Sequence, residues 1–122
     1  MSALTLTEPM PGLDPWTDYT LEAVTGAPGL FSLRPAENAD LRLFLLDASV
    51  YVPQYAPDLT DAAEGLGLAS GEAARVLVVA TPGADRTTVN LLAPVVVNER
   101  TGTGAQVILN DQDYPLQAPL AR

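Results

Sequence analysis

A chain of 122 residues, 48% hydrophobic and 17% charged, is long enough to bury one core without disulfides or metals, so residues 1–122 are expected to form a single domain. Cys and His are both absent, which excludes disulfides, thiolate nucleophiles, imidazole bases and zinc sites built from these residues. The 15 acidic and 6 basic residues give a net charge of -9 at pH 7, which opposes binding to nucleic acids and anionic membranes.

Short apolar or alternating runs, bounded by Pro, Gly, Asn and Asp, recur along the chain and indicate β-strands. In the first half, Asp18–Val24 alternates between two unlike faces, as a strand does. The other strands expected there are Leu4–Thr7, Leu30–Leu33 and Leu41–Leu46. The last two are separated by Arg34–Asp40, whose Pro, Asn and Asp residues favour a hairpin loop.

The middle of the chain is expected to hold a structured loop and the one helix. Tyr51–Pro57 contains two prolines, which exclude a regular helix and leave a stiff loop with two aromatic side chains. The helix is expected over Thr60–Leu68. Thr60 can cap its first turn, Asp61 suits its positive end, and glycines from Gly65 onward end it.

The second half is expected to contain a buried strand and a hairpin. Arg75–Ala80 has the composition of a buried strand. Val89–Val97 is expected as a longer strand, in which Pro94 requires an edge position or a bulge. Ala105–Leu109 follows a turn over Asn98–Gly104 and is expected to pair with that longer strand.

These elements predict an all-β fold. About eight short strands in one acidic domain indicate a small antiparallel β-barrel-like domain with one short helix, and a barrel is preferred to a sandwich because closure removes exposed strand edges. The irregular tail that follows contains Tyr114 and Leu116, which are expected to pack across the domain and close it.

No set of residues indicates catalysis or a bound cofactor. The serines have no His to activate them and no Gly-flanked turn that would present a nucleophile. Gly102-Thr-Gly104 resembles half of a dinucleotide-binding motif, but the third Gly is absent and a strand is expected to follow, so it is interpreted as a hairpin turn. We expect a protein that is not an enzyme and binds no cofactor or metal. A small-molecule-binding β-barrel remains as an alternative, which would need a deep pocket with acids of raised pKa.

The net negative charge lies entirely in the first part of the chain. Residues 1–72 hold 11 acids and 2 bases, whereas residues 73–122 hold 4 of each. This pattern fits a protein that binds a basic partner, although an acidic surface kept for solubility explains it as well.

The chain opens with no signal peptide and contains no apolar run near the roughly 20 residues that span a membrane, so a cytoplasmic location is expected.

Candidate partner-binding residues lie in the middle of the chain. Tyr51 and Tyr55 sit on the Pro-stiffened loop, and aromatic side chains on rigid loops commonly anchor interfaces. An acidic run follows them: Asp58, Asp61 and Glu64. The alternative is that both rings cap the barrel core and that the carboxylates form a solvated helix face.

Four motifs in the C-terminal half are Thr88-Val-Asn-Leu-Leu-Ala-Pro94, Val95-Val-Val-Asn98, Gly104-Ala-Gln-Val-Ile-Leu109 and Tyr114-Pro-Leu116. With this order and spacing, the chain resembles the FliW flagellar assembly factor family. The N-terminal half agrees more loosely, through Met10-Pro-Gly-Leu13, Phe31-Ser-Leu-Arg34, Asp47 and Pro53-Gln-Tyr55. In that half Leu13 replaces the family's aromatic residue, Pro35 its Ser and Ala48 its Pro.

The resemblance implies a cytoplasmic β-barrel protein that is not an enzyme. It implies binding to flagellin before secretion and, once flagellin has been exported, binding and antagonism of the carbon storage regulator CsrA. Because CsrA represses flagellin translation by binding messenger RNA, such a protein couples flagellin synthesis to flagellin export. The acidic charge agrees with this, since an RNA-binding regulator must be basic. A flagellin chaperone or scaffold without CsrA regulation is the alternative.

The motif residues themselves admit two interpretations. Asn90, Asn98, Gln106 and Tyr114 are candidates for direct partner contact. They can equally shape the barrel, because a side-chain amide satisfies backbone groups at a bulge and Pro94 fixes such a bulge.

Overall fold

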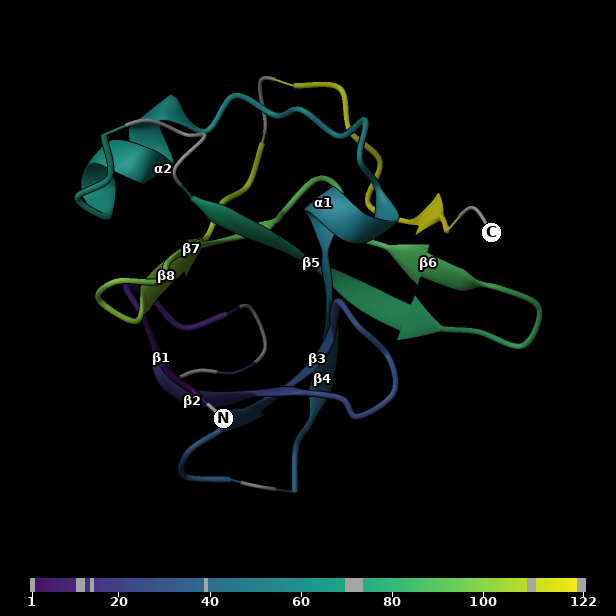
Figure 1. The fold of residues 1–122 in the computed structure, drawn as a ribbon, viewed down its shortest axis with the longest axis horizontal. Helices are drawn as coiled ribbons and strands as arrows, with labels where there is room; N and C mark the ends of the chain where they lie inside the picture. The colour runs from purple at the N-terminus through teal and green to yellow at the C-terminus, as the bar shows by residue number, and fades with distance from the viewer. Residues whose placement is uncertain are drawn as a thin grey trace.

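The computed structural model describes residues 2–10, 13, 15–38, 40–69, 74–109 and 112–120. Within these residues the chain forms nine strands and two short helices (Figure 1). The strands are β1 (Ser2–Leu6), β2 (Asp18–Ala23), β3 (Leu30–Pro35), β4 (Leu43–Asp47), β5 (Arg75–Pro82), β6 (Thr87–Val89), β7 (Val95–Asn98), β8 (Thr103–Gln106) and β9 (Ala118–Pro119). The helices are α1 (Ala48–Tyr51) and α2 (Thr60–Gly65).

Seven of these strands close into a barrel in the order β1, β2, β3, β4, β5, β7 and β8, with β8 returning to β1. The expected all-β barrel is confirmed. Six neighbouring pairs are antiparallel and the β1–β8 pair is parallel, because strands that alternate in direction around an odd-numbered ring must leave one parallel pair. β6 and β9 extend the sheet outside the barrel, from the C-terminal half of β5.

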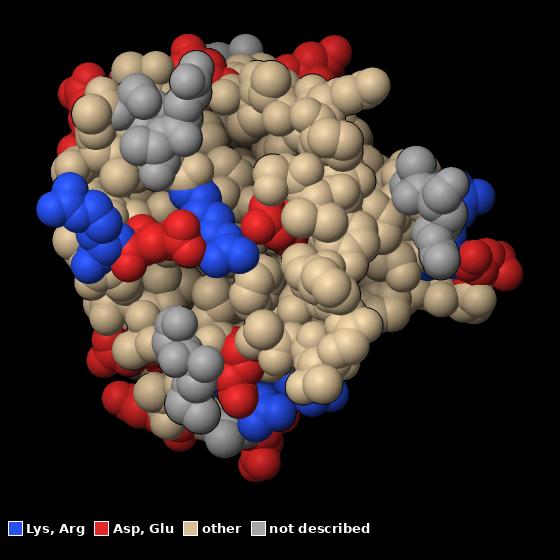
Figure 2. All heavy atoms as spheres, viewed as in Figure 1, with Lys and Arg blue, Asp and Glu red and all other residues tan. Residues whose placement is uncertain are grey.

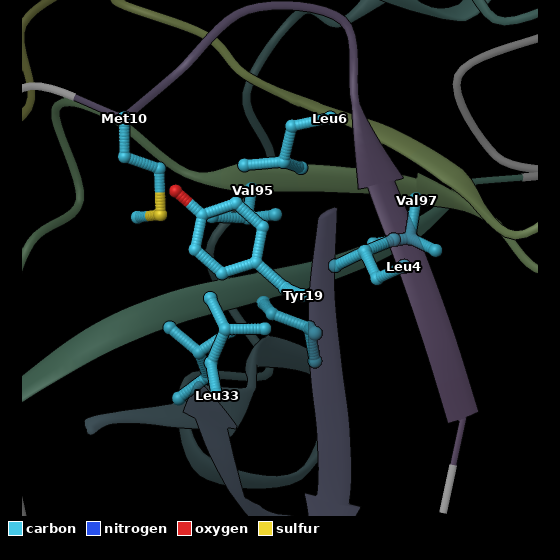
Figure 3. Packing of buried hydrophobic residues seen from close by; sticks show 9 residues of the cluster. Leu4, Leu6, Met10, Tyr19, Leu33, Val95 and Val97 are labelled. Atoms are coloured by element: carbon cyan, nitrogen blue, oxygen red, sulfur yellow. The ribbon is translucent and has the colours of Figure 1, made fainter. Parts of the chain in front are cut away.

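The barrel interior is filled by side chains. Figure 3 shows the Tyr19 ring next to Met10 and Leu33, and its hydroxyl donates to the Trp16 carbonyl at 3.0 Å. The remaining buried members of this inner cluster are Leu4, Leu6, Leu45, Leu77, Val95 and Val97. The β1–β2 connection contributes Met10, Leu13 and Trp16 to the packing, so it closes the end of the barrel that we call the β1–β2 end.

Strands β5 and β7 bury both of their faces, which explains their continuous apolar sequences. Leu77 and Val95 point into the inner cluster. Val78 faces outward into a second cluster beneath α1 and the segment after it, and Val96 faces outward into a third cluster beneath α2 and the C-terminal tail. The crossover between β4 and β5 therefore forms, with the tail, a second layer outside the barrel.

The expectation of one continuous strand over Val89–Val97 is wrong. Both β6 and β7 lie along β5, but residues 90–94 form an insertion between them. Asn90 Oδ1 accepts hydrogen bonds from the backbone N–H groups of Leu92 and Ala93, both at 3.0 Å, and so holds this insertion in a turn. Pro94 has no N–H to donate and is fully buried at the start of β7.

The helices also differ from expectation. Tyr51, expected at the start of a loop, is instead the last residue of α1, a helix that was not expected; Asp47 Oδ1 accepts from the N–H of Ser49 at 3.0 Å and caps this short turn. α2 ends at Gly65, shorter than expected, and Thr60 does not cap it. Gly67, at φ +76°, then allows the N–H of Leu68 to bond back to the Ala63 carbonyl at 2.8 Å and terminates the helix.

The predicted β7–β8 hairpin is confirmed, with a register that runs from Val95 opposite Gln106 to Asn98 opposite Thr103. Its second strand begins and ends earlier than the expected range of 105–109. The expected packing of Leu116 across the domain is wrong, since 56% of this residue is exposed.

Candidate functional site

The candidate residues from the middle of the chain lie on the second layer, together with the C-terminal tail. Tyr55 and Tyr114 meet edge to face, with ring centroids 4.8 Å apart and planes at 81°. The Tyr55 hydroxyl donates to the Leu91 carbonyl. These contacts tie three segments together: the crossover, the insertion before β7 and the tail.

Tyr55 is half-buried, and its burial raises the pKa of the phenol well above its usual value of 10.0. The neighbouring Tyr114 hydroxyl raises it further. Tyr55 is therefore a neutral hydrogen-bond donor at all physiological pH values. Its contacts are those expected of a ring that caps the core.

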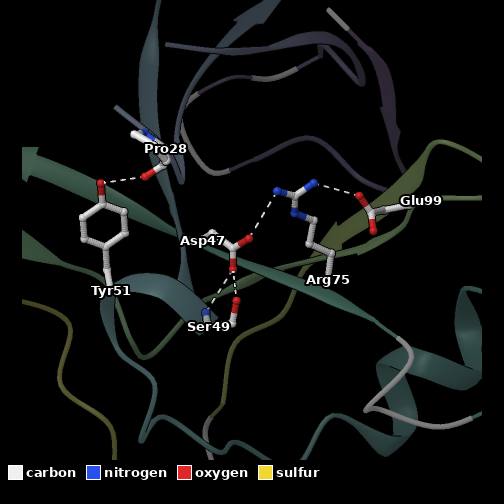
Figure 4. A network of polar contacts seen from close by, with 6 residues as sticks. All are labelled: Pro28, Asp47, Ser49, Tyr51, Arg75 and Glu99. Atoms are coloured by element: carbon white, nitrogen blue, oxygen red, sulfur yellow. Dashed lines mark hydrogen bonds and ion pairs between the residues drawn. The ribbon is translucent and has the colours of Figure 1, made fainter. Parts of the chain in front are cut away.

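Tyr51 has a similar role at the opposite end of the barrel from the β1–β2 connection. Its hydroxyl donates to the Pro28 carbonyl in the β2–β3 turn at 3.0 Å (Figure 4). A Cβ on Gly29 would lie 2.9 Å from the Tyr51 ring, so the ring and the turn are in close contact. Contact of Tyr51 or Tyr55 with a partner protein stays a prediction.

The three candidate carboxylates are exposed, and among the described residues none of them forms an ion pair. Asp58 Oδ1 accepts from the Thr60 hydroxyl at 2.7 Å and from the Thr60 N–H at 3.1 Å, and these bonds lower the pKa of Asp58. Asp61 and Glu64 lie three residues apart on α2. All three charges are available to a partner.

The backbone of Asp58 also attaches the crossover to the tail. Gln112 accepts from the Asp58 N–H at 2.8 Å and donates to the Asp58 carbonyl at 3.1 Å. Sequence reasoning did not identify Gln112, because its partner is 54 residues away in the chain.

The motif amides bond inside the chain. Asn98, which is 4% exposed, donates to the Leu66 carbonyl at 2.8 Å and accepts from the Arg100 N–H at 3.0 Å. Gln106 Nε2 donates to the Ala93 carbonyl at 3.1 Å, while its Oε1 is buried and has no partner among the described residues. Together with the bonds of Asn90, these contacts support the structural interpretation of the motif.

Arg75 forms an ion-pair network that sequence reasoning did not identify. Its Nη2 lies 3.2 Å from Asp47 Oδ2 and its Nη1 lies 2.7 Å from Glu99 Oε2 (Figure 4). The guanidinium also stacks 4.7 Å from the centroid of Phe31. Figure 2 shows basic and acidic groups alternating in a row across this face of the molecule.

Within the described part of the chain, no group of three or more acidic side chains is arranged to hold a metal ion. No helix there is both long and apolar enough to cross a membrane.

Comparison with known proteins identifies the family. The family model described as FliW protein matches residues 1–120. The chain belongs to the FliW family. It is similar to the flagellar assembly factor FliW of Desulfitobacterium hafniense strain Y51, with 35% identity over 91 residues that cover 72% of this chain and 60% of that protein. It is also similar to the FliW of Symbiobacterium thermophilum, with 30% identity over 116 residues that cover 89% of this chain and 84% of the relative.

The fold agrees with this family assignment. A crystal structure of the flagellar assembly factor FliW superimposes with a TM-score of 0.86 at 25% sequence identity, covering 97% of this chain and 84% of that one. The resemblance to the FliW family that the C-terminal motifs indicated is therefore confirmed. The match spans only 60% of the length of the Desulfitobacterium relative.

Proposed function

We propose that this protein is a cytoplasmic flagellar assembly factor without enzymatic activity, which binds flagellin and, after flagellin export, binds and antagonises CsrA. Membership of the FliW family over residues 1–120 carries this proposal. The relatives named flagellar assembly factor FliW support a role in flagellar assembly. A small-molecule-binding barrel has less support, because Leu33, Leu45 and Leu77 are fully buried inside a filled barrel.

The charge of the chain supports CsrA as a partner. A protein that binds messenger RNA presents basic side chains to the phosphates, and this chain carries a net charge of -9. An acidic protein docked beside an RNA site raises the electrostatic cost of RNA binding without occupying the site. Antagonism by this route needs no overlap between the two binding surfaces.

The exposed carboxylates of α2 are proposed to contact the basic partner, with Tyr51 and Tyr55 proposed as further contacts. We expect Asp61→Asn to weaken binding to CsrA and to lower the association rate. The matched control is Asp85→Asn, which removes the same charge from an exposed position in the β5–β6 turn. Equal effects of the two substitutions would assign the contribution to net charge and not to this surface.

The proposal is tested with purified flagellin, CsrA and a flagellin leader RNA from the same organism. We expect the protein to bind flagellin, to weaken the binding of CsrA to the RNA, and to lose this effect when flagellin is added. Flagellin binding without any effect on CsrA would overturn the regulatory part and leave a flagellin chaperone. Failure to bind either protein would overturn the function as a whole.

A further inference from the structure

The β1–β2 end of the barrel carries an apolar groove that the proposed function does not use. Its volume is about 590 Å³. It lies between the β1–β2 connection, the start of β4, the insertion before β7 and the segment after β8. Apolar side chains from all four line it: Met10, Leu13, Leu43, Leu92 and Ile108, joined by Leu116 of the tail.

Two of these side chains are unusually exposed for their type. Ile108 is 54% exposed and Leu116 is 56% exposed. The described residues contain only two other large apolar side chains of this kind, Leu41 and Val50, and neither lines the groove. Paired exposed apolar residues on the walls of a concave surface mark a binding site more strongly than isolated ones do.

One acidic residue lines the groove, and two more line a neighbouring hollow. Glu8 lies among the lining residues of the groove, and on the other side of Ile108 a second hollow is lined by Asp58 and Asp61. Within the described part of the chain, no arginine lines either hollow. The groove therefore offers apolar contacts flanked by unpaired negative charge, which suits a segment that is apolar on one face and basic at its edges.

The apolar walls of the groove suit the apolar face of an amphipathic helix. The N–H groups of Val107 and Leu109 already donate to the carbonyls of Pro94 and Leu92, at 2.9 and 2.8 Å. These bonds fix the segment after β8 as one wall of the groove, and an amphipathic helix docks against an apolar wall through its side chains.

We propose that this groove binds a basic amphipathic helix of a protein partner, with Ile108 and Leu116 against its apolar face and Glu8, Asp58 and Asp61 facing its basic residues. The inference rests on the proposed function only for the identity of the partner. It joins the candidate carboxylates of the crossover to the apolar groove as one continuous surface, with Ile108 at the junction.

The test uses the full chain and the variants Ile108→Asp and Leu116→Asp. Val50→Asp is the matched control, because Val50 is 55% exposed and lies on α1, away from the groove. The probes are a synthetic Leu/Lys peptide with Leu at helical spacing, the same peptide with Glu in place of Lys, and a Leu/Lys peptide with the spacing scrambled. Flagellin and CsrA are measured in parallel, and thermal unfolding confirms that each variant is folded.

We expect the Leu/Lys helix to bind and the other two peptides to bind at least about tenfold more weakly. Each groove variant should weaken binding of the helix about tenfold or more, while Val50→Asp changes it less than about twofold. Equal effects of the groove variants and the control would overturn the inference, as would preference for the Glu peptide or self-association of the protein through this groove.

If the helix binds as described and neither flagellin nor CsrA binds, the inference about the groove holds and the proposed function is wrong. If either partner binds and the groove variants leave it unaffected, the proposed function stands and the groove fails.

Discussion

The closure of the barrel depends on the absence of a side chain at Gly104. This residue is buried between β7 and β1, opposite Val97 on one side and Leu6 on the other. A Cβ there would lie 2.9 Å from the Val96 carbonyl oxygen and 3.3 Å from a methyl group of Leu4. Because the closest atom belongs to the backbone of a paired strand, Gly104→Ala must separate the strands at the seam of the barrel.

We expect Gly104→Ala to lower the free energy of unfolding by about 1–3 kcal/mol, the usual cost of overpacking a core. For a domain of this length that corresponds to a fall in Tm of about 3–10 °C. Gly65→Ala is the control, because nothing lies within 4 Å of the Cβ position of that residue at the end of α2. Thermal and urea unfolding measure both variants. An unchanged Tm for Gly104→Ala, or a fall no larger than that of Gly65→Ala, would refute the steric argument.

Three further predictions concern bonds and charges. Asn98→Ala leaves the Leu66 carbonyl and the Arg100 N–H without their partner and should lower the free energy of unfolding by about 1–3 kcal/mol in urea titrations. Because the pKa of Tyr55 is raised in the folded state, the contribution of Tyr55 to stability should be constant below the unfolded pKa of 10.0 and should be lost as the pH rises above it. Tyr55→Phe should reduce that loss, and an identical alkaline profile would contradict the assignment. The association rate with CsrA should decrease steeply as salt is raised while the dissociation rate changes little, and a rate independent of salt would exclude electrostatic steering.

The strands were predictable where one local pattern decides them. Asp18–Val24 alternates and forms β2, and the apolar run from Arg75 to Ala80 forms most of β5. Only Pro94 indicated an interruption between β6 and β7, because Val89 to Val97 is apolar apart from Asn90 and both parts lie along β5. The Asn90 side chain holds the turn locally, and distant residues hold the insertion in place, since Leu91 bonds to the Tyr55 hydroxyl and to the Pro115 carbonyl.

The site was less predictable than the fold, since its contacts join residues far apart in sequence. Arg75 pairs with Asp47 and Glu99, which are 28 and 24 residues away. α1 contains only four residues, and no pattern in its sequence distinguishes it from a loop. The helix and its cap, Asp47, were therefore not predicted. The groove at the β1–β2 end combines side chains from four separate segments, and no spacing in the sequence indicates that they meet.

The residues that carry the family resemblance hold the second layer against the barrel. Asn90 fixes the insertion, Asn98 reaches the end of α2, and Tyr114 packs on Tyr55. Because their polar and aromatic contacts are directed inside the chain, the structural interpretation of these residues is supported, and their direct contact with a partner stays a prediction. For the proposed recognition, the described surface offers two kinds of exposed side chain: the carboxylates of the crossover and the apolar pair Ile108 and Leu116. A substitution of a crossover carboxylate should change mainly the rate of association with a partner and its salt dependence. A substitution of Ile108 or Leu116 should change mainly the rate of dissociation.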